Sequence, residues 1–201
     1  MLNIIRLFKK SFLKYFPGIS IIGGCYLDES YDFDGYELAM GDDLDDIEVV
    51  SIKKDSISII NTTIPSLPKG LRMLRGTQLL NQDLLVLGGY DENDVENDEY
   101  LRFDQSSSQW KKIGTRKMAT VSHSSVLLNG CLYSCGGYDS SDKVTSHHEV
   151  LNLNGRVEEK KELPIALADH TANKLNEYQY MVIGGHDETY VSKEFWIIKN
   201  R

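Results

Sequence analysis

Short apolar runs separated by polar turns fill most of this chain, and four of the runs end on a pair of glycines. The doublets are Gly23-Gly24, Gly88-Gly89, Gly136-Gly137 and Gly184-Gly185. The last three begin 48 residues apart, whereas 65 residues separate Gly23 from Gly88. Apolar runs of this length between turn residues are typical of β-strands. The fixed period predicts one supersecondary unit copied along the chain, with an insertion in the first copy.

The third unit shows what each copy contains. Apolar runs at 123–128 and 131–135 flank Asn129-Gly130, a strong hairpin signal. An expected strand at 149–153 and a charged fourth strand at 156–160, suited to an outer edge, flank Asn154-Gly155. The second unit repeats this order at 76–80, 84–87, 100–104 and 109–113, and the fourth has three such runs, at 170–175, 180–183 and 194–198. We therefore predict an all-β protein of four-stranded antiparallel units over residues 17–68, 69–115, 116–163 and 164–201.

The first unit is less regular. Its expected strands lie at 19–22, 47–52 and 57–60, and the acidic stretch Asp28–Asp46 is expected to be a solvated insertion, because it lacks the spacing of a calcium-binding EF-hand. Residues 1–16 allow two interpretations. They form either a basic amphipathic helix, or two strands, Leu2–Leu7 outside the fourth unit and Ser11–Phe16 inside the first.

The repeated residues resemble the kelch repeat. An apolar run ends on Gly-Gly, a tyrosine follows at Tyr90 and Tyr138, and Trp110 lies in the fourth strand of its unit. The likeness covers residues 71–201 well and 17–68 loosely; His186 replaces the tyrosine, and the first and third units lack the tryptophan. It implies a β-propeller of about four four-stranded blades, with glycines where inner strands crowd together. The ring is either closed by residues 1–16 or incomplete.

Charge and composition narrow the class of partner and the compartment. A net charge of −8 argues against binding nucleic acid through phosphate neutralisation. No apolar run of 18 residues exists, so we expect neither a transmembrane helix nor a membrane partner. The odd set Cys25, Cys131 and Cys135 suits buried thiols in a reducing compartment, and we expect a cytoplasmic protein.

The histidines are given structural roles. His123 and His170 recur at equivalent positions, which favours a hydrogen bond between neighbouring blades over catalysis. His147 and His148 are expected in a solvated segment, because adjacent strand residues point to opposite faces and cannot join one metal site. We expect no catalytic residue, metal or cofactor.

The loops after the doublets are the expected binding surface. They should project from one end of the propeller and give it a negative field suited to a basic peptide or protein. The candidate binding residues are Asp91, Glu92, Asp94, Asp98, Tyr138, Asp139, Asp142, His186 and Asp187. The function expected is a non-enzymatic protein-interaction module. The kelch resemblance adds ubiquitin-ligase and cytoskeletal components as partner classes.

Two alternatives stay open. Kelch-like propellers also occur in a copper-radical sugar oxidase and a sialic-acid epimerase; the oxidase type needs two tyrosines, two histidines and a cross-linking cysteine at the axis. Cys135 lies near the expected axis end, but the sequence shows no tyrosine partner for it. The other alternative is a propeller fragment without a function of its own.

Overall fold

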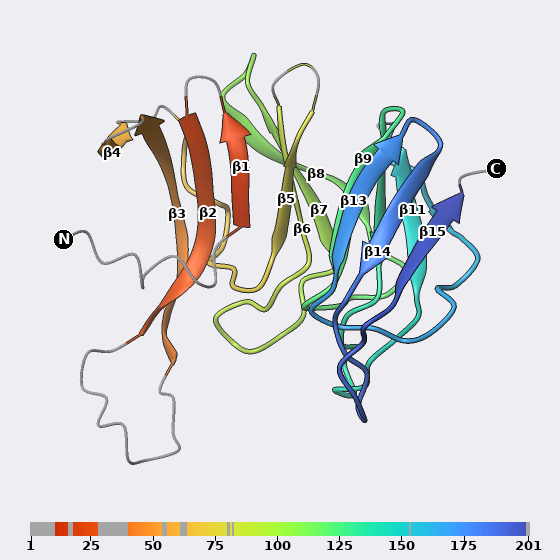
Figure 1. Ribbon diagram of the computed structural model, residues 1–201. Helices are drawn as coiled ribbons and strands as arrows, with labels where there is room; N and C mark the ends of the chain where they lie inside the picture. Colours follow the sequence, from red (N-terminus) through yellow and green to blue (C-terminus); the bar gives the residue numbers. More distant parts are fainter. Residues whose placement is uncertain are drawn as a thin grey trace.

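The structure, a computed structural model, describes residues 11–15, 18–27, 40–53, 56–60, 64–79, 81, 83–152 and 154–199 (Figure 1). Strands are the regular elements of these residues, and they form four antiparallel sheets. The described residues contain no helix, hence none with the length and apolar character that crossing a membrane requires. The expected all-β class is confirmed.

Each sheet is built from strands that follow one another in the chain. The first sheet contains β1 (Ser11–Tyr15), β2 (Gly18–Leu27), β3 (Met40–Lys53) and β4 (Ser56–Ile60). The second contains β5 (Arg75–Gln78), β6 (Leu84–Leu87), β7 (Glu99–Asp104) and β8 (Gln109–Thr115). The third contains β9 (Ser124–Leu128), β10 (Cys131–Cys135), β11 (His148–Asn152) and β12 (Val157–Glu159). The fourth has three described strands, β13 (Thr171–Asn176), β14 (Gln179–Ile183) and β15 (Phe195–Lys199).

The four sheets stand in a row through their first strands. β1 contacts β5, β5 contacts β9, and β9 contacts β13, so the first strand of every sheet is the inner one. Figure 1 shows the first sheet at the left, the second in the middle, and the third and fourth, which overlap in this view, at the right. The arrangement is propeller-like, but the described sheets do not close into a ring.

Apolar side chains fill the spaces between neighbouring sheets. Leu85, Leu87 and Tyr100 of the second sheet pack with Leu132 and Leu151 of the third. Tyr133, Cys135 and Val150 of the third sheet pack in turn with Tyr180 and Val182 of the fourth. Because the second sheet buries a face on the third, and the third on the fourth, the core is shared between units, as expected for repeats that do not fold singly.

The first unit corrects two expectations. β2 does not end at its glycine doublet but continues to Leu27, and β3 begins at Met40, so residues 40–46 form a strand and not a solvated loop. Cys25 pairs with Asp43 and Leu27 with Met40, with register shifts on either side of the Gly24–Cys25 pairs. Antiparallel pairing therefore extends into the acidic stretch, whose residues 28–39 lie outside the described part.

The N-terminal expectations are settled in part. Residues 11–15 are a strand, β1, paired with β2, so the expected inner strand of the first unit is confirmed and a helix there is wrong. The expected strand Leu2–Leu7 lies outside the described residues.

The glycine doublets end β6, β10 and β14, and their first glycines show why. Gly136 has a φ of +65°, and an added Cβ would collide with the Leu167 carbonyl and lie 2.6 Å from His170 Cε1 of the next sheet. His123 covers Gly88 in the same way. Gly184 has a similar φ of +67°, yet an added Cβ would meet no described atom within 4 Å, because no described sheet follows the fourth.

Candidate functional site

The three loops that follow the doublets of the second, third and fourth units share one backbone pattern. Tyr90, Tyr138 and His186 each form an isolated β-bridge to the connection that precedes their own sheet, and a second bridge across their own loop. Figure 1 shows these loops together at the lower end of the sheets. We call this end the doublet end; it consists of residues 90–97, 138–145 and 186–192 with the neighbouring Arg72 and Asp169.

An aspartate at the same position shapes each loop. Asp139 Oδ1 accepts hydrogen bonds from the amides of Ser141, at 2.8 Å, and Lys143, at 3.1 Å. Asp91 and Asp187 accept equivalent bonds from amides two to four residues later. Such side-chain turns replace backbone hydrogen bonds and fix the loop. Three of the predicted binding residues therefore order the surface, whatever they contribute to binding.

Tyr138, His186 and Asp169 form a hydrogen-bonded group at this end. His186 Nδ1 donates to the Asp187 carbonyl at 2.9 Å. Its Nε2 lies 3.3 Å from Tyr138 Oη and 3.2 Å from Asp169 Oδ2. A neutral imidazole accepts from the tyrosine hydroxyl, whereas a protonated one donates to the aspartate. The Asp187 hydrogen bond, and then Asp169, raise the pKa of His186.

The loop of the second unit is organised differently, around an arginine. Arg72 forms an ion pair with Asp94, donates to the Asp91 carbonyl at 3.1 Å, and lies 5.0 Å from the centre of the Tyr90 ring. The negative charge of Asp94 is thus compensated. Burial and then the charge of Asp142 raise the pKa of Tyr90.

The predicted binding residues therefore have different roles in the structure. It brings Tyr138 and His186 together, uses Asp91, Asp139 and Asp187 as turn formers, and pairs Asp94 with Arg72. Asp142 has a φ of +56° and an exposed side chain. Glu92 and Asp98 are exposed, and the Asp98 carbonyl accepts the Arg116 amide at 2.7 Å.

Sequence reasoning missed two features of the doublet end. Asp169 belongs to the connection before β13, immediately before the recurrent His170, and that repeat position was the available signal. Three large apolar side chains also lie exposed among the acidic ones, Val95 at 54%, Tyr190 at 54% and Val191 at 76%. In the sequence, valine and tyrosine are typical of buried strand positions, so the pattern of the chain alone does not identify these three as surface residues.

A second cluster fills the interface of the third and fourth sheets. Tyr133, Cys135, His148, His170 and Tyr180 converge there, and of these the sequence pattern predicted a contact between sheets for His170 alone. His148 Nδ1 donates to the Lys161 carbonyl at 2.8 Å, and its Nε2 accepts from Tyr180 Oη, also at 2.8 Å. His148 is buried, so its expected place in a solvated segment is wrong.

This cluster has the features of a packed core. Burial raises the pKa of the Cys135 thiol to about 11, and burial also raises the pKa of Tyr180. His170 Nε2 lies 3.6 Å from Cys135 Sγ, which is a contact between sheets as predicted. His123 departs from that prediction, since its ring nitrogens have no hydrogen-bond partner among the described residues. Across the described residues, histidines, cysteines and carboxylates form no group of three or more that could hold a metal ion.

Comparisons with known proteins show the fold alone. No model of a protein family matches the chain, and no curated protein matches it in sequence. Solved structures do resemble it. One of them, YjhT, superposes with a TM-score of 0.68 at 15% sequence identity, over 88% of this chain. YjhT has a β-propeller-like fold, and the match spans 58% of its length.

Proposed function

We propose that this chain is a kelch-type β-propeller module that binds a basic protein partner at the doublet end, in the cytoplasm, and that it has no catalytic role. The observation that supports this most is the set of three ordered loops that share one pattern of backbone bridges at one end of the sheets. Loops fixed before binding lose little conformational entropy on association. Ubiquitin-ligase and cytoskeletal components, the partner classes of kelch relatives, are the classes we propose to examine first.

The chemistry of the doublet end suits a protein surface. Val95, Tyr190 and Val191 are exposed next to acidic side chains, and exposed apolar residues within a polar surround are typical of interaction sites. Asp142, Asp169 and Glu188 are exposed. Besides burial, the charge of Asp142 raises the pKa of Tyr90, and the charges of Asp169 and Glu188 raise the pKa of Tyr138. A partner with lysine or arginine side chains would gain in both association rate and specificity.

A binding experiment tests the proposal. The probe is a fluorescent lysine-rich peptide, titrated by anisotropy into the full chain at low and at physiological ionic strength. The double variant Asp142→Asn with Glu188→Gln should weaken binding about fivefold or more and flatten the salt dependence, because two carboxylates of the surface lose their charge.

The matched control removes two carboxylates elsewhere. Glu158 lies on β12 and Glu177 in the β13–β14 hairpin at the opposite end, and the double change Glu158→Gln with Glu177→Gln gives the same net charge. The control should bind like the unaltered chain. Equal weakening in both variants would show a general charge effect and contradict a localised site.

A further inference from the structure

We propose a second, separate binding surface: the outer edge of the fourth sheet takes up an extended acidic peptide as an added β-strand, and an aromatic side chain of that peptide enters a cavity beside the edge. The inference does not rest on the proposed function, because it concerns other residues and the opposite sign of charge.

The sheet edge is the first part of this surface. Among the described residues β15 pairs on one edge alone, with β14. In the second and third sheets the strands at the equivalent position pair with one more strand: β7 pairs with β8, and β11 pairs with β12. An edge of this kind presents a row of backbone donors and acceptors to which an extended peptide can add.

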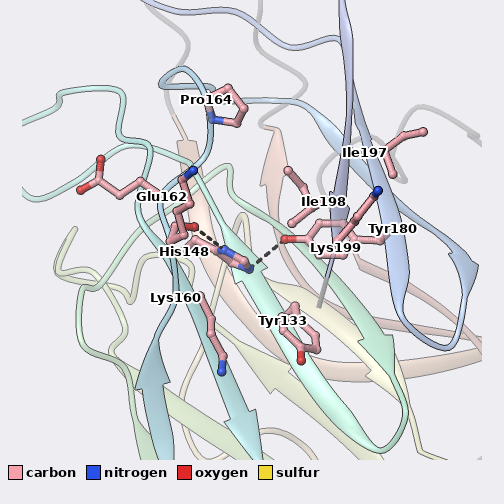
Figure 2. A pocket seen from close by; sticks show the side chains of 10 residues that line it. Tyr133, His148, Lys160, Glu162, Pro164, Tyr180, Ile197, Ile198 and Lys199 are labelled. Atoms are coloured by element: carbon pink, nitrogen blue, oxygen red, sulfur yellow. Dashed lines mark hydrogen bonds between the residues drawn. The ribbon is translucent and has the colours of Figure 1, made fainter. Parts of the chain in front are cut away.

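A cavity of about 500 Å³ lies beside this edge, between the third and fourth sheets. Pro164, Ile198, Tyr180, His148, Tyr133 and Lys160 are among its lining residues. Figure 2 shows these side chains around a common space, with the hydrogen bond between His148 and Tyr180 joining its two sides. A cavity of this volume is within the range of ligand pockets and accommodates a large side chain.

The second sheet shows what occupies the corresponding position there. Trp110 of the outer strand β8 lies opposite Phe103, with ring centres 5.5 Å apart, and its Nε1 donates to the Pro65 carbonyl at 3.0 Å. In the fourth sheet, Ile198 holds the register position of Phe103, since Tyr180 pairs with Ile198 as Leu84 pairs with Phe103.

The connection before the fourth sheet extends the correspondence. Ala168 bridges His186 as Arg72 bridges Tyr90, so Lys161, seven residues before Ala168, holds the position that Pro65 holds before Arg72, and it lines the cavity. The cavity next to Lys161 and Ile198 is therefore the place where a tryptophan of an added strand would lie.

Charge selects the peptide. Lys160, Lys161 and Lys199 line the cavity, while its one acidic lining residue, Glu162, accepts a hydrogen bond from Ser146 at 2.8 Å. Glu158 Oε2 lies 3.6 Å from Lys160 Nζ, so this carboxylate compensates the positive charge of one of the three lysines. A peptide with carboxylates beside its aromatic residue complements this edge.

A separate peptide fits better than the N-terminal segment of the chain itself. Outer and inner strands of successive sheets are joined by residues 61–74, 116–123 and 160–170. If Leu2–Leu7 were the added strand, Phe8–Lys10 alone would join it to β1. Three residues span roughly 10 Å when fully extended, so this link would be the shortest of the four. A separate peptide is under no such constraint, and for this reason it fits the edge better.

The experiment uses the full chain and a defined probe. The probe is the fluorescein-labelled peptide Gln-Trp-Glu-Glu-Ile-Gly-Thr, which is β8 with its two lysines replaced by glutamates. We expect saturable binding by anisotropy. Replacing the peptide tryptophan by alanine, or N-methylating alternate backbone amides, should each weaken it tenfold or more. Lys199→Glu should weaken it severalfold, and Lys174→Glu, on exposed β13, should not.

Three results would overturn the proposal. One is no binding by the full chain. Another is binding that survives both the alanine change and N-methylation, which would be electrostatic attraction alone. The third is binding that appears only in a variant lacking residues 2–7, since the chain's own segment would then hold the edge. Lys199→Glu should leave binding of the lysine-rich peptide at the doublet end intact, so the two proposals fail separately.

Discussion

His170 illustrates how a single residue connects two units. Its ring is buried and lies against Gly136 of the preceding sheet, and burial lowers its pKa to about 4. Burial also lowers the pKa of His123, which covers Gly88 in the same manner. Both rings are therefore neutral in the folded chain near neutral pH, whereas in the unfolded chain they titrate near the ordinary value of 6.5.

This difference predicts an acid-dependent loss of stability. With its folded pKa below the unfolded one, the stabilisation that His170 contributes is complete above pH 6.5 and is lost as the pH falls toward 4. Within that window its slope reaches about 1.4 kcal/mol per pH unit. His123 acts in the same direction. Urea denaturation at several pH values between 4 and 7 gives the free energy of unfolding at each pH. This free energy should change less steeply with pH for His170→Gln than for the unaltered chain.

The control for that slope is His186→Asn. Hydrogen bonds to Asp187 and Asp169 raise the pKa of His186, so its contribution is present at low pH and is lost as the pH rises through the raised value. Its removal should not make the acid slope shallower. An identical pH slope for His170→Gln and the unaltered chain would show that His170 is not held neutral by burial.

The residue scale also shows where sequence reasoning was insufficient. The sequence identifies acidic residues in loops, but it does not separate Asp139, whose carboxylate caps its own loop, from Asp142, whose carboxylate is exposed. Likewise Glu149 is one more strand residue in the sequence. In the structure it is fully buried, and its Oε1 lies 2.8 Å from Nε of Arg116, in the connection that follows β8. Burial opposes its ionisation, but the His147 hydrogen bond and Arg116 outweigh burial and lower its pKa to about 2.

At the scale of elements, strands that depend on local pattern were predictable. β6 and β10 occupy the residues that their apolar runs indicated, because the turns that bound them are encoded next to them. The extensions of β2 and β3 were not predictable. They result from pairing of residues 24–27 with residues 40–44, and the acidic residues there show no alternating pattern of apolar and polar positions. Side-chain convergence between sheets, as at Tyr180 and His148, has no local signal at all.

The doublets offer a matched test of packing between sheets. Gly136 and Gly184 have nearly the same φ, but an added methyl group collides with Leu167 and His170 at Gly136 alone. Gly184→Ala should cost only the left-handed strain of about 1–2 kcal/mol. Gly136→Ala should cost roughly 2 kcal/mol more, because overpacking adds to the same strain.

Urea unfolding of the two alanine variants measures this difference. The control is built into the pair, since the backbone strain is shared. Equal destabilisation would mean either that the third sheet is not covered as described or that a further element covers the fourth sheet equally closely.

At the scale of the whole molecule, the number of doublets predicted the number of sheets, but not whether the ring closes. The fourth sheet exposes Ile183 at 39%, Phe195 at 61% and Ile197 at 49%. The residues paired in the same way in the third sheet, Cys135 and His148, are buried by the fourth. Closure depends on contacts between the ends of the chain, for which a repeating pattern carries no information.

The propeller-like arrangement nevertheless explains how the doublet end arises. Because the second, third and fourth sheets repeat the same order of strands, their doublets and the loops that follow lie at the same end, and neighbouring loops touch through pairs such as Tyr138 and His186. A composite surface of three loops thus follows from one repeated unit. The basic edge of the fourth sheet lies outside this repetition, because among the described residues β15 has no counterpart of β8 or β12 beside it.

The most direct test of the binding proposal is a residue-by-residue map of amide chemical shifts, recorded by NMR as the lysine-rich peptide is added. The account predicts that the shifts concentrate in residues 90–97, 138–145 and 186–192, and that the Asn129–Gly130 and Glu177–Tyr178 turns at the other end stay unchanged. Shifts centred on those turns, or spread evenly over the four sheets, would contradict it.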